Sequence, residues 1–115
     1  RSQMEPGDVA AAVRIVVDDY EMAGQQLMHM LGQEHQFPAL SALLDVGRRG
    51  HRKWVRWAFA PQLAAAGRRR RSHTEDLLVV ATDVYTWKLL RIDRGLGVKA
   101  TREAMTELCE AVASR

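Results

Sequence analysis

The chain has 115 residues, of which 47% are hydrophobic, and a formal net charge of +3. This length suffices for one domain, residues 1–115, whose core needs no disulfide or metal ion for stability. A single cysteine, Cys109, excludes disulfide scaffolds and zinc fingers, and no apolar run approaches the ~20 residues of a membrane-spanning helix. We expect a soluble, cytoplasmic protein with no cofactor and no membrane partner.

The first predicted helix runs from Val9 to about Leu31. Asp8 is a candidate N-cap, and apolar residues recur after it every three or four positions, which is the helical period. The stretch from Gly32 to Pro38 then breaks the pattern, because Gly disfavours helix interiors and Pro biases the preceding residue out of the helical region.

Two further helices are predicted before Gly67. Pro38 opens a short one, which we expect to end at Gly47 or Gly50. A third begins at about Arg48 or His51 and extends to Leu63, with Pro61 kinking or ending it.

The run from Leu77 to Leu96 belongs to a predicted helix over about 73–94, with Ser72 or Thr74 as N-cap. Its apolar residues cover an arc of roughly 200°, about twice the stripe of a helix that lies on one core. Gly95 and Gly97 are stop signals, and an amphipathic helix over 98–114 follows. The sequence therefore predicts an all-α fold of five helices.

The aromatic and methionine side chains either form the core, which is their usual role, or line an apolar pocket between helices. Asp83, one turn before Trp87, borders the apolar arc and either holds a ligand's polar group or pairs with an arginine of a neighbour, such as its Arg91 or Arg94. The candidate ligand-binding residues are Tyr20, Met28, Phe37, Trp54, Trp57, Asp83 and Trp87.

Basic residues concentrate in two segments, Arg48 to Arg56 and Arg68 to Arg71, which together carry nine positive charges and no acid. Arg48, Arg52 and Arg56 are spaced to follow a phosphate backbone, so direct binding of nucleic acid is an alternative function. The other interpretation is a solvated helix face whose side-chain stems cover Trp54 and Trp57.

No residue pattern indicates catalysis or a metal site. His29, Glu34 and His35 lack the further ligands and the spacing of a zinc site, and neither a phosphate loop nor a catalytic triad is recognisable. We expect a protein that is not an enzyme.

The segments EHQFPALSALLDVGRRGHRKWVRWAFAPQL and ATDVYTWKLLRIDRGL resemble the C-terminal regulatory domain of tetracycline-repressor (TetR) family transcription factors. The resemblance covers about Val9 to Val112. It implies a five-helix domain whose last two long helices form a four-helix bundle with a second subunit, and a cavity for a small apolar or aromatic effector between the other helices. A homodimer seam is implied at Leu78, Ala81, Tyr85, Leu89, Met105, Leu108 and Val112.

The resemblance further implies a transcriptional regulator, with repression as the expected mode. The family's N-terminal helix-turn-helix has no counterpart in this sequence, and the chain begins at Arg1 without an initiator Met. We therefore expect a fragment or an incomplete chain, which would reach operator DNA only through the missing N-terminal domain.

Overall fold

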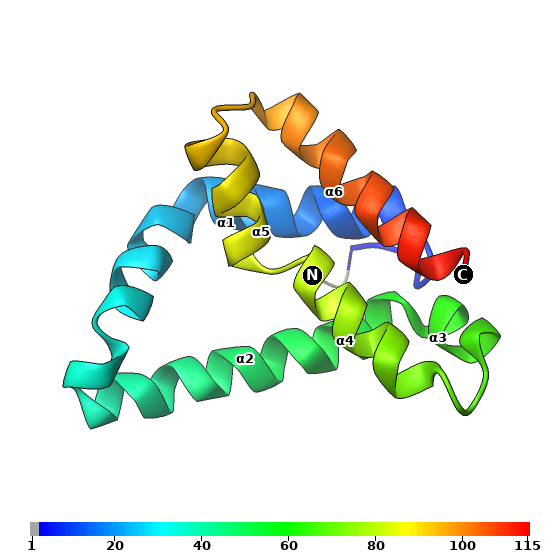
Figure 1. The fold of residues 1–115 in the computed structure, drawn as a ribbon, viewed down its shortest axis with the longest axis horizontal. Helices are drawn as coiled ribbons and strands as arrows, with labels where there is room; N and C mark the ends of the chain where they lie inside the picture. Colours follow the sequence, from blue (N-terminus) through cyan, green and yellow to red (C-terminus); the bar gives the residue numbers. More distant parts are fainter. Residues whose placement is uncertain (1–2) are drawn as a thin grey trace.

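The computed structural model describes residues 3–115, which contain helices and no strand. Figure 1 shows α1 and α2 diverging from a corner, like two sides of a triangle, while α4 and α5 form the third side and α6 lies along α1. The elements in chain order are α1 (Val9–Gly32), a 3-10 turn (Glu34–Gln36), α2 (Pro38–Ala58), α3 (Ala60–Ala66), α4 (Arg71–Ala81), α5 (Val84–Lys88), a π-helical turn (Leu89–Asp93) and α6 (Val98–Ala113). None of the described helices is both long and apolar enough to cross a bilayer.

Helix α1 confirms the first predicted helix. The Asp8 side chain accepts a hydrogen bond from the backbone N–H of Ala11 at 3.1 Å, which satisfies one of the unpaired donors at the helix start. Val13, Val16 and Val17 are fully buried. The N-terminal half of α1 is therefore the central element of the core.

Helix α2 corrects the prediction of two helices in this region. It continues through Gly47 and Gly50 to Ala58, and Pro61 lies in the first turn of the separate helix α3. Ion pairs hold α2 between these glycines and just after them, from Arg48 to Glu34 at 2.6 Å and from Arg52 to Glu75 at 2.6 Å. These tertiary contacts, together with burial of the last turns of α2, outweigh a helix-propensity cost of about 1 kcal/mol per glycine.

The prediction of one continuous helix over 73–94 is wrong. Helix α4 ends at Ala81, and α5 begins at Val84 after a sharp break at Thr82 and Asp83. The Thr82 hydroxyl donates to the Leu78 carbonyl at 2.8 Å, and the Asp83 carboxylate accepts from the N–H of Tyr85 at 2.9 Å, so both side chains compete with continued helical bonding.

The two ends of this region also differ from the prediction in part. Helix α4 begins at Arg71 with Arg70 at the N-cap position, so neither Ser72 nor Thr74 caps it. The chain stops being helical before Gly95, whose φ of 77° is accessible to glycine at little cost. This stop confirms the predicted role of Gly95.

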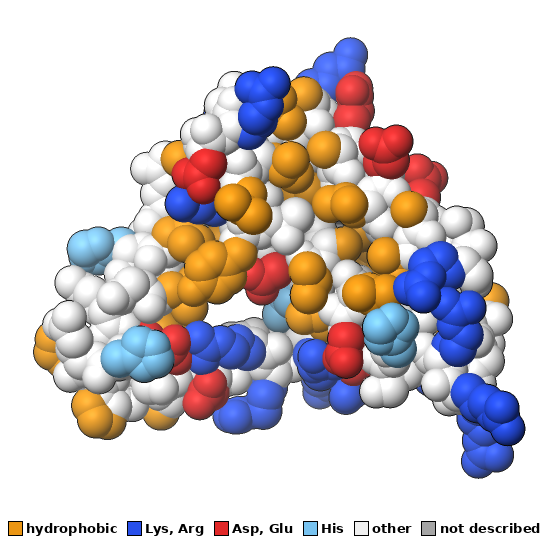
Figure 2. All heavy atoms as spheres, viewed as in Figure 1, with side chains coloured by type: hydrophobic (Ala, Val, Ile, Leu, Met, Phe, Trp, Pro, Cys, Tyr) orange, Lys and Arg blue, Asp and Glu red, His pale blue; other side chains and the backbone are white. Residues whose placement is uncertain are grey.

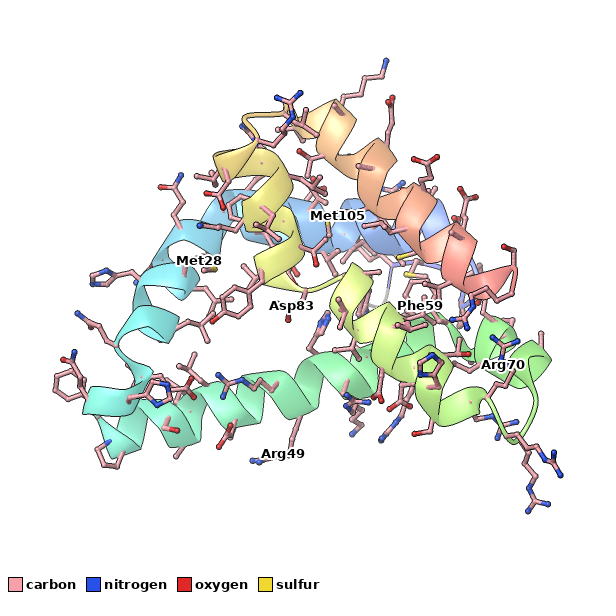
Figure 3. All side chains as sticks on the ribbon, in the orientation of Figure 1. Met28, Arg49, Phe59, Arg70, Asp83 and Met105 are labelled. Atoms are coloured by element: carbon pink, nitrogen blue, oxygen red, sulfur yellow. The ribbon has the colours of Figure 1, made fainter. Side chains whose placement is uncertain are left out.

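The core lies where α6 and α4 cover α1 and the end of α2. Phe59, Leu78 and Met105 are its largest fully buried side chains, and Figure 3 shows Met105 between α6 and α1. The outer ends of α1 and α2 extend away from this core towards the 3-10 turn. Apolar residues on these outer ends are thus left to line a cavity.

Candidate ligand site

A cavity of about 450 Å³ lies between the outer halves of α1 and α2 and the start of α5. Figure 2 shows the molecule hollowed through between α2 and the side formed by α1 and α5. Its lining residues are Tyr20, Leu27, Met30, Leu31, Leu43, Leu44, Val46, Gly47, Arg48, His51, Asp83, Val84 and Tyr85.

The walls of the cavity are mainly aliphatic. Leu27, Met30 and Leu31 are spaced at three and four residues, so they share one face of α1. Leu43 is 59% exposed although it lines this cavity. Apolar side chains that line the cavity are thus exposed to solvent, which is unfavourable in free energy unless a ligand or a partner covers them.

Gly47 lines the cavity without contributing a side chain. A Cβ atom built at this position meets nothing within 4 Å. Space therefore remains at this point for a ligand or for a larger residue.

Polar groups gather at one place in the lining, beside the break between α4 and α5. The Thr82 hydroxyl donates to the Leu78 carbonyl at 2.8 Å, and its oxygen forms a hydrogen bond of 3.0 Å with Nε2 of His51. The Tyr20 hydroxyl donates to the Thr82 carbonyl at 2.8 Å. Thr82, which is fully buried, thus fixes one side chain from α1 and one from α2 at the cavity.

Asp83 follows directly and lies at the edge of the opening in Figure 3. One carboxylate oxygen caps α5 by accepting the Tyr85 N–H. This cap is a role that neither sequence interpretation of Asp83 included.

Arg48 brings a second charge to the lining, but carboxylates surround it. Its guanidinium donates to Glu34 at 2.6 and 2.7 Å and to Asp45 at 2.8 Å. The hydrogen bond from Arg48 is the largest cause of the lowered pKa of Glu34. Arg48 therefore adds little net positive charge to the cavity.

Of the predicted ligand-binding residues, Tyr20 and Asp83 line the cavity. Trp87 is instead a core residue, 2% exposed, whose indole N–H donates to Glu21 at 2.7 Å. Trp54 is buried against Phe59, with which it makes an edge contact.

The other three candidates also lie outside the cavity lining. Met28 packs against the core, and Phe37 and Trp57 are exposed at the surface. The aliphatic wall and His51 were missed, although the apolar spacing in α1 beyond Tyr20 was a usable signal.

The predicted dimer seam divides into two groups. Leu78, Ala81 and Met105 are at most 4% exposed within their own chain, so they offer no surface to a partner and the prediction is corrected for them. Val112 is partly buried against the same core. Tyr85, Leu89 and Leu108 are 50%, 60% and 45% exposed and remain available.

The basic stripe on α2 is engaged in ion pairs within the chain. Arg52 pairs with Glu75 and Asp76, and Arg56 pairs with Glu75 at 2.7 Å. With Arg48, three of the nine basic residues thus pair with carboxylates from other segments. These ion pairs lower the positive potential that a phosphate backbone would meet. Arg68 to Arg71 form an exposed turn and the start of α4.

Comparisons with known protein families, with characterised proteins and with solved structures find no match for this chain. Its function is therefore inferred from the cavity and the surfaces described above.

Proposed function

We propose that this domain senses a small, largely apolar effector, which binds in the cavity between α1, α2 and α5. The observation that carries the proposal is the cavity itself. Its volume of about 450 Å³ lies within the range of roughly 300–1,000 Å³ that is typical of small-molecule sites. Apolar walls with a few grouped polar side chains are the usual composition of such sites.

The proposal includes pairing with a second copy of the chain. Tyr85, Leu89 and Leu108 expose apolar surface on α5, the π-helical turn and α6, and Figure 2 shows hydrophobic side chains clustered over this part of the molecule. A homodimer would remove this surface from water.

The wider role follows the resemblance in the sequence. In a TetR-like regulator, this domain would join an N-terminal DNA-binding domain, and effector binding would shift the dimer between two arrangements. Two DNA-binding domains must match half-sites about 34–36 Å apart, so a small tilt of α1 suffices to change operator affinity.

Gly47 and Gly50 provide a matched test of effector binding. Both lie in α2 and have open space at the Cβ position, but only Gly47 lines the cavity. We expect a neutral aromatic compound, naphthylethanol, to bind the unmodified protein in isothermal titration calorimetry. Gly47→Leu should weaken its binding about tenfold or more because the new side chain takes up ligand space, a change of about 1.4 kcal/mol.

Gly50→Leu is the control and should bind naphthylethanol as the unmodified protein does. Leucine also raises helix propensity at both positions, so loss of folding is not expected in either variant. Equal binding by both variants, or no binding by any of the three proteins, would contradict the proposed function.

Light scattering tests the dimer. We expect a dimeric mass at tens of micromolar and a monomeric mass for Leu89→Glu, which places a charge on the exposed apolar surface. Met22→Glu, at a position on α1 that is 90% exposed, should remain dimeric. A monomeric unmodified protein would overturn the dimerisation part of the proposal.

A further inference from the structure

The charged groups around the cavity are more often acidic than basic. Arg48 is the basic residue of the lining, and its guanidinium is shared between Glu34 and Asp45. Asp83 is the acidic residue of the lining. Counted with the two partners of Arg48, the charged groups at the cavity therefore have a negative sum.

The Asp83 carboxylate has capacity for a ligand. Its Oδ2 atom accepts the Tyr85 N–H at 2.9 Å, whereas an ionised carboxylate offers about four acceptor positions in all. The side chain is partly buried at the rim of an apolar space. Hydrogen bonds to a charged group in such a place are stronger than those in open water.

Two tyrosines make hydrogen bonds at the break that carries Asp83: the Tyr20 hydroxyl donates to the Thr82 carbonyl, and the Tyr85 N–H donates to the Asp83 carboxylate. Tyr20 and Tyr85 both line the cavity, and aromatic faces attract cations through their quadrupole. A ligand with an ammonium group thus finds a carboxylate and two tyrosines in the lining of one cavity, and its apolar body finds the aliphatic wall of α1 and α2. An anionic ligand meets Asp83 instead and must compete with Glu34 and Asp45 for Arg48.

We infer that the cavity selects a lipophilic amine, whose ammonium group binds the carboxylate of Asp83 while its apolar or aromatic body contacts α1 and α2. This inference rests on the proposed function and specifies the chemical class of the effector.

Three compounds with the same naphthyl body test the inference by calorimetry, namely naphthylethylamine, naphthylethanol and naphthylacetate. The amine should bind between about tenfold and a hundredfold more tightly than the alcohol, as a charge-assisted hydrogen bond implies, and the carboxylate should bind most weakly. In Asp83→Asn, the amine should lose this advantage over the alcohol. Asparagine is also a preferred N-cap residue, so α5 should keep its start.

Asp93→Asn is the matched control, because it removes one acidic charge from the π-helical turn, outside the cavity lining. It should leave the order of the three affinities unchanged. Equal affinity for amine and alcohol in the unmodified protein, or an amine preference that survives Asp83→Asn, would overturn the inference while the cavity still binds the alcohol. Failure of all three compounds to bind would instead refute the proposed function, and the inference with it.

Discussion

Substituting Gly24 in α1 should destabilise the fold, although alanine is the better helix former. A Cβ atom at Gly24 would lie 2.6 and 2.8 Å from two ring carbons of Trp87. Trp87 cannot easily retreat, because it is 2% exposed and its indole N–H is held by Glu21 at 2.7 Å. The Gly24→Ala variant must therefore move α1 and α5 apart or force the indole off its rotamer.

The magnitude follows from two opposing effects. Overpacking of a close contact costs about 1–3 kcal/mol, whereas replacing a helical glycine with alanine gains about 1 kcal/mol. We expect a net loss of up to about 2 kcal/mol in the free energy of unfolding. Gly47→Ala has only the favourable effect, since its Cβ meets open space, and it should gain up to about 1 kcal/mol.

Urea denaturation of the three proteins measures this difference directly, with the change in free energy of unfolding taken from the midpoints at equal slope. In thermal unfolding, the two variants should shift in opposite directions, by about 4 °C per kcal/mol for a domain of this size. A double-mutant cycle with Trp87→Phe should show coupling between the two positions. If Gly24→Ala is as stable as Gly47→Ala, the packing described for α1 and α5 is wrong.

Three further predictions concern the core and its ion pairs. Met105→Ala, at a fully buried position of α6, should lower the free energy of unfolding by about 2–5 kcal/mol in urea, and a loss below about 1 kcal/mol would place Met105 outside the core. The hydrogen bond from Arg56 is the largest cause of the lowered pKa of Glu75. The Glu75 carboxylate therefore stabilises the fold fully at a pH above the pKa of about 4.3 that Glu has in the unfolded chain. This contribution is lost as the pH falls through the lower pKa of the folded state. The stability difference between the unmodified protein and Glu75→Gln should therefore shrink below about pH 4, and a difference independent of pH would contradict the ion pairs. Burial raises the pKa of the Cys109 thiol to about 12, so a thiol reagent should react with it at neutral pH only in denaturant, whereas rapid labelling of the native protein would show that α6 is open.

Most of the fold was predictable where the signals are local. Asp8 at the start of α1, Pro38 at the start of α2 and Gly95 before α6 all act as the sequence indicates. Asp8 caps a helix end with its side chain, Pro38 has a fixed φ, and Gly95 adopts a positive φ at little cost. Their effect therefore depends little on the rest of the chain.

The continuity of the helices was less predictable. Gly47 and Gly50 suggested a break, but α2 continues through both, with a tertiary ion pair from Arg48 to Glu34 beside them. Thr82 and Asp83 interrupt what looked like one long helix. A capping residue inside an apolar run was a signal for this break, but its weight was only apparent once the contacts of Thr82 with Tyr20 and His51 were known.

The candidate site was predictable only in part for the same reason. Large aromatic residues were the natural candidates, but Trp54 and Trp87 bury more apolar surface than the smaller residues and were drawn into the core. Aliphatic residues on the outer halves of α1 and α2 were left for the cavity. Which apolar residues do which task depends on where the helices diverge, and no local pattern specifies that point.

The most direct test of the central claim is a titration of the isotope-labelled protein with naphthylethylamine, followed residue by residue in heteronuclear NMR spectra. If the cavity is the effector site, the largest shift changes should fall on Leu27, Leu43, Asp83 and their lining neighbours, with small changes around Met105 in the core. Shifts that are confined to the exposed face around Leu89 and Leu108, or that are spread evenly over the chain, would contradict an effector site between α1, α2 and α5.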